Sequence, residues 1–349
     1  MTRNIYLDIV KGVAIVLVVF GHCLQFGTSL AVNDQYFLDP VFKAIYSFHM
    51  PLFMLVSGYL FYGSLTRHTF RYNLRTRVSG LVVPIVVWVT ITLLLSDFLI
   101  LRKGGSISIQ DNLLSYLTSI WFLWSIFWCS LSVMIINKSF NDSIIVYIVF
   151  GVLLLFLPDG YGINYHVYMY PYFVIGYLWN KKSLYAKFAK SSRQNKIYAF
   201  GVSLLIFVAF YLHFTKEDYI YTSGTCALQN INGIFSIDTH QIGIDIIRYA
   251  IGFAGSVCML LILKPLTAIM HNHVKVLLSE LGKKSIGIYI ISVVFINYRI
   301  LRRIPMRDSL SYSGGGGVIE TVAVLAVTYL VTLLLEKKQL TRKLFLGSR

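Results

Sequence analysis

Charged side chains are scarce in this chain of 349 residues. Only 13% of the residues are charged, against about 25% in a typical soluble domain. Hydrophobic residues make up 56% of the chain, and apolar runs of about 20 residues, enough to cross about 30 Å of hydrocarbon, recur from end to end. This composition leaves no room for a large soluble domain. We therefore predict a single transmembrane domain over residues 1–349.

Cysteines are also few, and their spacing suits neither a metal site nor a disulfide framework. Three lie in apolar runs, where thiols are usually inert, and one lies alone in a loop. The four are Cys23, Cys129, Cys258 and, in the loop, Cys226. No Gly-x-Ser-x-Gly elbow is present, so no motif supports a serine acyl-enzyme. The first apolar run contains Lys11 and His22 and lacks a small-residue cleavage site, which argues against a removable signal peptide.

The apolar runs predict an all-α integral membrane fold with about ten transmembrane helices. The predicted helices run from Ile9 to Phe26, Val41 to Tyr62, Val78 to Leu101, Ser115 to Ile136, Ser143 to Leu157, Val167 to Trp179, Ile197 to Phe214, Ile242 to Leu263, Ser285 to Leu301 and Val318 to Leu335. The fifth and sixth are short, and no internal repeat is visible.

The net charge of +16 comes mostly from short loops between these helices, a pattern that orients membrane proteins and does not favour nucleic-acid binding. The basic loops after the second, sixth and eighth helices and the basic C-terminal tail fall on one side. Positive-inside orientation then places both termini in the cytoplasm. One basic loop falls on the opposite side in this layout. Either the ninth helix is shifted, or the arginines of this loop serve an anionic ligand or lipid. They are Arg299, Arg302, Arg303 and Arg307.

The longest loop on the predicted outer side runs from about Thr215 to Gln241 and is polar. Two interpretations stay open for it: a lid over an outward-facing site, or an ordinary surface loop.

The first predicted helix carries Asp8, Lys11 and His22, which are costly inside a membrane and usually face a cavity or a partner. Lys11 and His22 are eleven residues apart, about three helical turns, so they lie on nearly the same face about 16 Å apart. Asp8 precedes Lys11 by three residues and can pair with it. With the N-terminus inside, Lys11 lies near the cytoplasmic edge and His22 lies deep.

The second predicted helix enters from outside and contains His49, Pro51 and Ser57. His49 lies about 12 Å along this helix by its rise per residue, near the depth of His22. Pro51 is expected to kink the helix and free a carbonyl there. Either histidine could simply be an interhelical hydrogen-bonding residue; the aligned lysine, the matched depths and the proline favour chemistry for the pair.

At these residues the chain resembles the acyltransferase 3 family of membrane acyltransferases. Lys11 to His22, with Asp8 before them, resembles the family's Arg-x10-His signature, and the run from Phe48 through Ser57 to Tyr59 resembles its second-helix motif. Weaker similarities follow in the expected order over nearly the whole chain. They are Trp121 to Trp124, Tyr172 to Tyr177, and Leu281 to Tyr289.

The resemblance implies a ten-helix fold, an acyl-CoA donor on the cytoplasmic side, usually acetyl-CoA, and a polysaccharide, peptidoglycan or lipid-linked sugar as acceptor. It implies no permanently bound cofactor or metal. His22 would be the catalytic base, His49 the second histidine of the site, and Lys11 would stand in place of the motif arginine near the donor. Trp121 and Tyr289, with Ser57, are the expected supporting residues. A neutral imidazole could take the proton from a sugar hydroxyl as its oxygen attacks a thioester carbonyl.

The chain departs from the family pattern at three places. Lysine at position 11 keeps the charge of arginine but loses its planar fork. Gly80 stands where a second arginine is expected after Arg77, and Ser292 stands where a histidine is expected.

Arg71, Arg75 and Arg77 lie in the cytoplasmic segment before the third helix, with Arg67 just upstream. Arginine offers paired donors to phosphates, so this cluster suits binding of CoA. Ordinary positive-inside charge explains it as well. The position of Arg77, close to the start of the helix, favours donor binding for that residue.

Our leading hypothesis is an O-acetyltransferase of the bacterial inner membrane that modifies a surface polysaccharide, such as an O-antigen, or its lipid-linked precursor. The alternative is a carrier or flippase that moves a glycan or an acyl group without bond chemistry, since intramembrane titratable residues also suit transporters. A purely structural membrane subunit would leave Lys11 and His22 unexplained.

Overall fold

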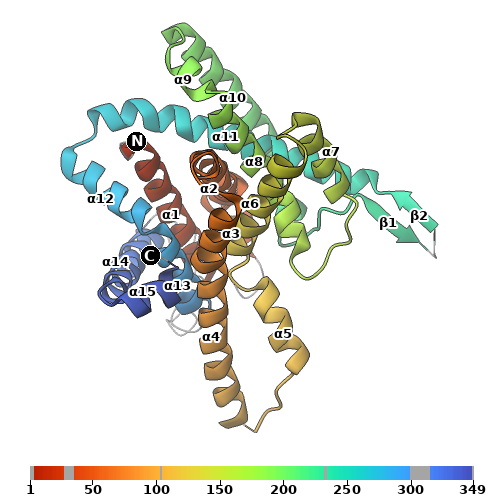
Figure 1. Cartoon of the computed structure of the whole chain (residues 1–349), viewed down its shortest axis with the longest axis vertical. Helices are drawn as coiled ribbons and strands as arrows, with labels where there is room; N and C mark the ends of the chain where they lie inside the picture. The colour runs from red at the N-terminus through yellow and green to blue at the C-terminus, as the bar shows by residue number, and fades with distance from the viewer. Residues whose placement is uncertain (1–3, 27–34, 103, 232–233, 299–314, 348–349) are drawn as a thin grey trace.

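A computed structural model describes residues 4–26, 35–102, 104–231, 234–298 and 315–347, and the chain is nearly all helical there (Figure 1). The helices are α1 Ile5–Phe26, η2 Gln35–Leu38, α2 Pro40–Leu65, α3 Phe70–Arg77, η3 Val78–Val82, α4 Val83–Arg102, α5 Ile109–Thr118, α6 Trp121–Ser139, α7 Ile144–Leu154, α8 Ile163–Lys181, α9 Leu184–Ala189, α10 Arg193–His213, η4 Lys216–Asp218, α11 Thr239–Ile269, α12 Asn272–Lys283, α13 Ser285–Tyr298, α14 Gly317–Glu336 and α15 Gln339–Leu346. The strands β1 Leu228–Ile231 and β2 Ile234–Ile237 form one antiparallel hairpin.

A helix occupies each of the ten predicted positions. Within the described ranges, seven helices are long and apolar enough to cross a membrane: α1, α2, the continuous stretch from α3 to α4, α6, α10, α11 and α14. Two shorter apolar helices are α7 and residues 285–294 of α13. The chain is therefore a multi-pass membrane protein, while the count of ten and the cytoplasmic placement of both termini stay predictions.

The predicted helix from Ser115 to Ile136 is two helices, α5 and α6. Ile120 breaks the run because it adopts the left-handed conformation, with φ of 54°, which β-branched residues rarely adopt. Its side chain is buried, so tertiary packing holds this backbone. As a result Trp121 becomes the first residue of α6.

Paired glycines bring the central helices unusually close. A Cβ at Gly12 of α1 would lie 1.9 Å from the carbonyl oxygen of Leu278, and one at Gly282 of α12 would lie 1.8 Å from that of Asp8. The crossing of α2 and α8 repeats this arrangement: Gly58 meets the backbone of Phe173, and Gly176 meets that of Leu55. Because small residues let membrane helices approach, these glycines fix where α1, α2, α8 and α12 touch. Each pair lies within segments that resemble the family motifs.

The N-terminus of α2 is set by a conventional cap. The side chain of Asp39 accepts hydrogen bonds from the backbone N–H groups of Val41 and Phe42, both at 2.8 Å, and Pro40 occupies the first helical position. The helix then continues through Pro51 to Leu65. His49 therefore lies within the helix, between Pro51 and Ser47, whose carbonyl oxygen lacks the i−4 hydrogen bond that a proline cannot donate.

A charged junction ties the loop between α6 and α7 to the end of α8. Asp142 forms an ion pair with Lys181 at 2.5 Å and accepts hydrogen bonds from Tyr147 and Tyr177 at 2.6 and 2.9 Å. Burial acts to raise the pKa of Asp142, but these donors prevail and hold it below its usual range.

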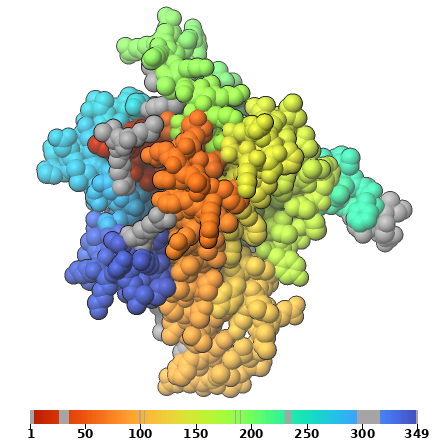
Figure 2. Space-filling view, in the orientation of Figure 1, coloured from red at the N-terminus to blue at the C-terminus, as the bar shows by residue number. Residues whose placement is uncertain are grey.

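The polar segment that follows α10 contains regular secondary structure. The hairpin pairs Leu228 with Ile237 and Ile231 with Ile234, and it projects from the body of the molecule (Figure 2). The residues just before it fold back over the helices and are held by α11, as shown below. The arginines Arg299, Arg302, Arg303 and Arg307 lie outside the described residues.

Candidate active site

A cavity of about 190 Å³ brings together four of the predicted site residues, and we name it the Lys11 cavity. Lys11 of α1, Ser57 of α2, Arg77 at the end of α3 and Tyr289 of α13 all line it. Lys283 of α12 adds a third cation. The space is large enough for several waters or for the end of a thioester chain. Carboxylates partly neutralise the two lysines, Asp8 beside Lys11 and Glu280 beside Lys283, so an anionic ligand is favoured mainly through Arg77.

Lys11 is positioned by its own helix and by α12. Its ammonium lies 3.1 Å from the carboxylate of Asp8, the i,i+3 pair expected from the sequence. Asp8 is buried, and its carbonyl oxygen lies against Gly282. The crossing of α1 with α12 therefore sets the distance between Lys11 and the cations and hydroxyls that α12 and α13 contribute.

Arg77 differs from the two arginines before it. Its guanidinium lies over the ring of Phe61, 4.5 Å from the ring centroid, and it reaches the Lys11 cavity. Arg71 and Arg75 are exposed on α3 and do not line the cavity. Of the arginine cluster, only Arg77 is placed to contact a ligand in this cavity.

His49 is buried, at 2% exposure, and its tautomer follows from its contacts. Its Nδ1 lies 2.8 Å from the carbonyl oxygen of Ile45. A carbonyl only accepts, so Nδ1–H donates, and in a neutral ring Nε2 carries the lone pair. Nε2 is then the nitrogen of His49 that can accept a proton or a hydrogen bond from a ligand.

His22 lies beside His49, on the neighbouring helix. Gly21 of α1 packs directly against the ring of Tyr46, and Tyr46 contacts His49 with ring centroids 4.8 Å apart. The Nδ1 atom of His22 is buried and has no hydrogen-bond partner among the residues that the structure describes. A buried polar atom without a partner is costly and often marks a place where a ligand or water belongs.

A second, smaller space also borders Met50, and we name it the His49 cavity. It measures about 10 Å³, room for about one water. His49 and Trp121 line it together with aromatic residues of α2, α8 and the segment after α10. Among the described residues that line them, Met50 is common to both cavities, so the space containing Lys11 and the space containing His49 border the same side chain.

The roof of the His49 cavity is the segment Asp218–Tyr221. Burial raises the pKa of Tyr221 well above its ordinary value, and it raises that of Tyr219 too, so both phenols stay protonated and can donate. The hydroxyl of Tyr219, whose side chain is 3% exposed, has no hydrogen-bond partner within the described ranges. A residue that lines the His49 cavity therefore carries a hydroxyl without a partner among the described residues.

Arg248 of α11 anchors this roof. It is 1% exposed, and it donates to the carbonyl oxygens of Asp218 and Gly224 and to the hydroxyl of Ser223, at 2.9, 2.9 and 2.5 Å. Asp245, one turn earlier, pairs with it at 3.0 Å. These bonds hold the segment against α11, and the choice between a lid and an ordinary surface loop stays open.

The sequence carried a signal for this anchor. Asp245 and Arg248 are charges three residues apart inside a predicted membrane helix, and intramembrane charges usually serve a partner or a cavity. The sequence interpretation used this signal only for the first two predicted helices and did not identify the charged pair in the eighth. His166 of α8 was missed as well; its Nδ1 lies 2.9 Å from the hydroxyl of Ser125 on α6.

A family described as an acyltransferase domain matches residues 4–337 of the chain. The chain belongs to this acyltransferase family. The match runs from before α1 to just beyond α14, so it includes every residue that lines the two cavities. The predicted resemblance to the family is confirmed.

Two curated relatives share part of the chain. One is the nodulation protein NolL of Mesorhizobium japonicum (strain LMG 29417 / CECT 9101 / MAFF 303099), 30% identical over 232 residues, which are 63% of this chain and 59% of that protein. The other is the nodulation protein NolL of Sinorhizobium fredii (strain NBRC 101917 / NGR234), 39% identical over 126 residues, 36% of this chain and 34% of that protein. The matched regions thus span less than two thirds of the length of either relative.

Proposed function

We propose that the protein transfers an acyl group, most simply acetyl, from acyl-CoA to a hydroxyl of a surface polysaccharide or lipid-linked sugar. The observation that carries this proposal is the adjacency of the two cavities. Cations line the first, histidine and aromatic side chains line the second, and Met50 alone is shared by both. A donor with phosphates and an acceptor with hydroxyls need these two environments side by side.

The donor end lies in the Lys11 cavity in this proposal. Lys11, Arg77 and Lys283 attract the phosphates of CoA, and the cavity admits the thioester end of the molecule. Lysine serves as a point charge and arginine as a fork, so Lys11 and Arg77 make different contacts with the same anionic donor. In this proposal acyl-CoA is a substrate, so the enzyme needs no permanently bound cofactor.

The acceptor end lies in the His49 cavity. Trp121 stacks on Tyr165 with ring centroids 4.7 Å apart, which gives a flat aromatic surface of the kind on which a sugar ring packs. The hydroxyl of Tyr219 donates to a sugar oxygen. Entry requires the roof to open, because the closed space holds only about one water.

His22 acts as the general base in this mechanism, and His49, through Nε2, accepts a hydrogen bond from a neighbouring hydroxyl of the same sugar. The hydroxyl oxygen attacks the thioester carbonyl as its proton passes to the imidazole of His22. The carbon–sulfur bond then breaks, and the proton passes from the imidazolium to the departing thiolate. The products are the sugar ester and free CoA, and the enzyme returns to its starting state.

The decisive experiment follows radiolabelled acetyl from acetyl-CoA into glycan, using the purified full-length protein in lipid. His22→Ala is expected to lose at least about 100-fold in transfer rate, within the range that general base catalysis supplies. His213→Ala is the matched control, because His213 is exposed at the end of α10. Wild-type transfer by His22→Ala contradicts the mechanism, and glycan transport without any bond formation contradicts the enzymatic function.

A further inference from the structure

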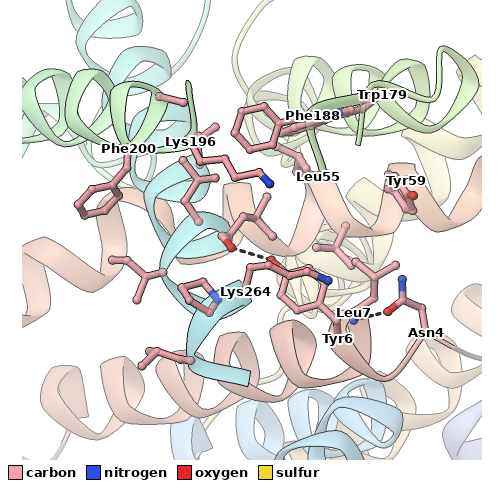
Figure 3. Close-up of a pocket in the computed structure, with 18 of the residues that line it drawn as sticks. Asn4, Tyr6, Leu7, Leu55, Tyr59, Trp179, Phe188, Lys196, Phe200 and Lys264 are labelled. Carbon is pink, nitrogen blue, oxygen red and sulfur yellow. Dashed lines mark hydrogen bonds between the residues drawn. The ribbon is translucent and has the colours of Figure 1, made fainter. Parts of the chain in front are cut away.

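The largest cavity in the described part of the chain lies away from both histidines. It is a groove of about 690 Å³ between the start of α1, the second half of α2, the first turns of α10 and the last turns of α11 (Figure 3). We refer to it as the groove. Neither Lys11, His22 nor His49 lines it, and the acyl-transfer proposal makes no use of it.

The groove is polar at one end and apolar along the rest. Arg193 and Lys196 lie in the first turn of α10, and Lys264 lies close to the end of α11. Beyond them the walls are aliphatic and aromatic, with Phe200 on α10 and Leu260 on α11. No Asp or Glu is among the described residues that line the groove.

The cations are held beside the groove by the walls themselves. The ammonium of Lys264 lies 4.7 Å from the centroid of the Tyr6 ring, and the hydroxyl of Tyr6 donates to the carbonyl oxygen of Leu260 at 2.7 Å. Figure 3 shows the side chains of Lys196 and Lys264 extending between the helices. Positive charge at one end and hydrocarbon along the rest complement an amphiphile that carries an anionic head.

The position of α10 indicates where that amphiphile comes from. No residue of α10 is buried, although the helix is apolar and long enough to cross a membrane, and it packs chiefly on α11. The side of α10 that faces away from α11 therefore faces the bilayer, and the groove behind the helix opens to the same hydrocarbon. A lipid can enter sideways from the bilayer with no change of depth.

We propose that the groove binds one anionic phospholipid of the bilayer, with its phosphate at Arg193, Lys196 and Lys264 and its chains against Leu260 and Phe200. The groove shares α1 and α2 with the Lys11 cavity, and Leu7 of the groove directly precedes Asp8. The bound lipid thereby supports the helix ends that carry the Lys11–Asp8 pair.

The test measures lipid retention by native mass spectrometry of the full-length protein. The protein is reconstituted in vesicles of equal parts phosphatidylcholine and phosphatidylglycerol and then extracted in detergent. The wild type is expected to retain one phosphatidylglycerol in preference to phosphatidylcholine. Lys196→Ala with Lys264→Ala is expected to reduce this retention about fivefold for each cation removed.

Matched control variants distinguish a specific lipid site in the groove from a general effect of positive charge on lipid retention. Lys187→Ala with Lys190→Ala removes two exposed cations of the neighbouring segment that do not line the groove, and it is expected to leave retention unchanged. Ala199→Trp fills the groove and should expel the lipid, whereas Val202→Trp places the same side chain on an exposed position of α10 and should not.

Three results would overturn the proposal. One is full retention in the Lys196 and Lys264 double variant, and the second is equal loss in the Lys187 and Lys190 control. The third is displacement of the lipid by acetyl-CoA or inorganic phosphate, which would make the groove a site for soluble anions. The His22→Ala variant is expected to retain the lipid, so this proposal and the acyl-transfer mechanism can fail independently.

Discussion

Replacing Gly282 by alanine is expected to disable the site without removing any chemical group from it. The added Cβ would lie 1.8 Å from the carbonyl oxygen of Asp8 and 2.8 Å from the backbone nitrogen of Gly12. Ordinary Cβ contacts lie beyond about 3.4 Å, so α12 and α1 must separate by about 1.6 Å. Both clashes are with backbone, so no side-chain rotation relieves them.

The magnitude follows from that displacement. Overpacking typically costs about 1–3 kcal/mol, and the better helix propensity of alanine returns about 1 kcal/mol of this at most. The catalytic cost is larger, because a misplacement of about 1 Å can reduce rate about 100-fold. Lys11 and Asp8 move with α1, while Lys283 moves with α12, so the Lys11 cavity widens.

The assay compares acetyl transfer and thermal unfolding of the purified Gly282→Ala variant with those of the wild type. Gly201→Ala is the control, since Gly201 is also helical and a Cβ there meets no heavy atom within 4 Å. The control is expected to gain about 0.5–1 kcal/mol and keep its activity. The reasoning about the helix crossing is refuted if Gly282→Ala transfers acetyl within about threefold of the wild-type rate, since a displaced cavity predicts about 100-fold.

Three further predictions concern charges. Lys11→Arg should keep acetyl transfer near the wild-type rate if charge alone serves the donor; strong loss in the transfer assay would show a site built around an ammonium. Arg77→Ala should raise the KM for acetyl-CoA about tenfold, the worth of one charged contact, whereas Arg71→Ala should barely change it; equal effects would make the cluster a general field. Asp142→Asn should lower the free energy of unfolding by about 1 kcal/mol at neutral pH, a modest value because solvent partly screens the ion pair. Because its folded-state pKa is lowered, this difference is full above an unfolded pKa of about 4 and vanishes as pH falls through the folded value, which unfolding titrations would detect.

Local pattern was sufficient for the helices and for the residues of the first two. Apolar runs predicted a helix at each of the ten positions because backbone polar groups in a membrane must be satisfied within their own segment. The i,i+3 spacing predicted the Asp8–Lys11 pair, which the structure shows at 3.1 Å. The break at Ile120 was beyond local pattern, because a left-handed isoleucine is held by tertiary packing.

The candidate site likewise combines residues that the sequence identified with an arrangement that only the fold shows. The sequence alone identified Lys11, His22 and His49 as candidates. A titratable side chain inside a membrane is energetically costly whichever way its helix packs. Only the tertiary structure placed Met50 in the lining of two cavities and distinguished Arg77, which lines the Lys11 cavity, from Arg71 and Arg75, which do not.

The sequence by itself determined that the chain is a helical membrane protein and which family it resembles, because hydropathy and short motifs are local properties. The depth, partners and cavities of those motifs depend on which helices touch and how closely. Gly12, Gly58, Gly176 and Gly282 decide this by admitting backbone against backbone. A lone glycine in an apolar run does not reveal which distant helix it will meet, and this contact is what the folded structure decides.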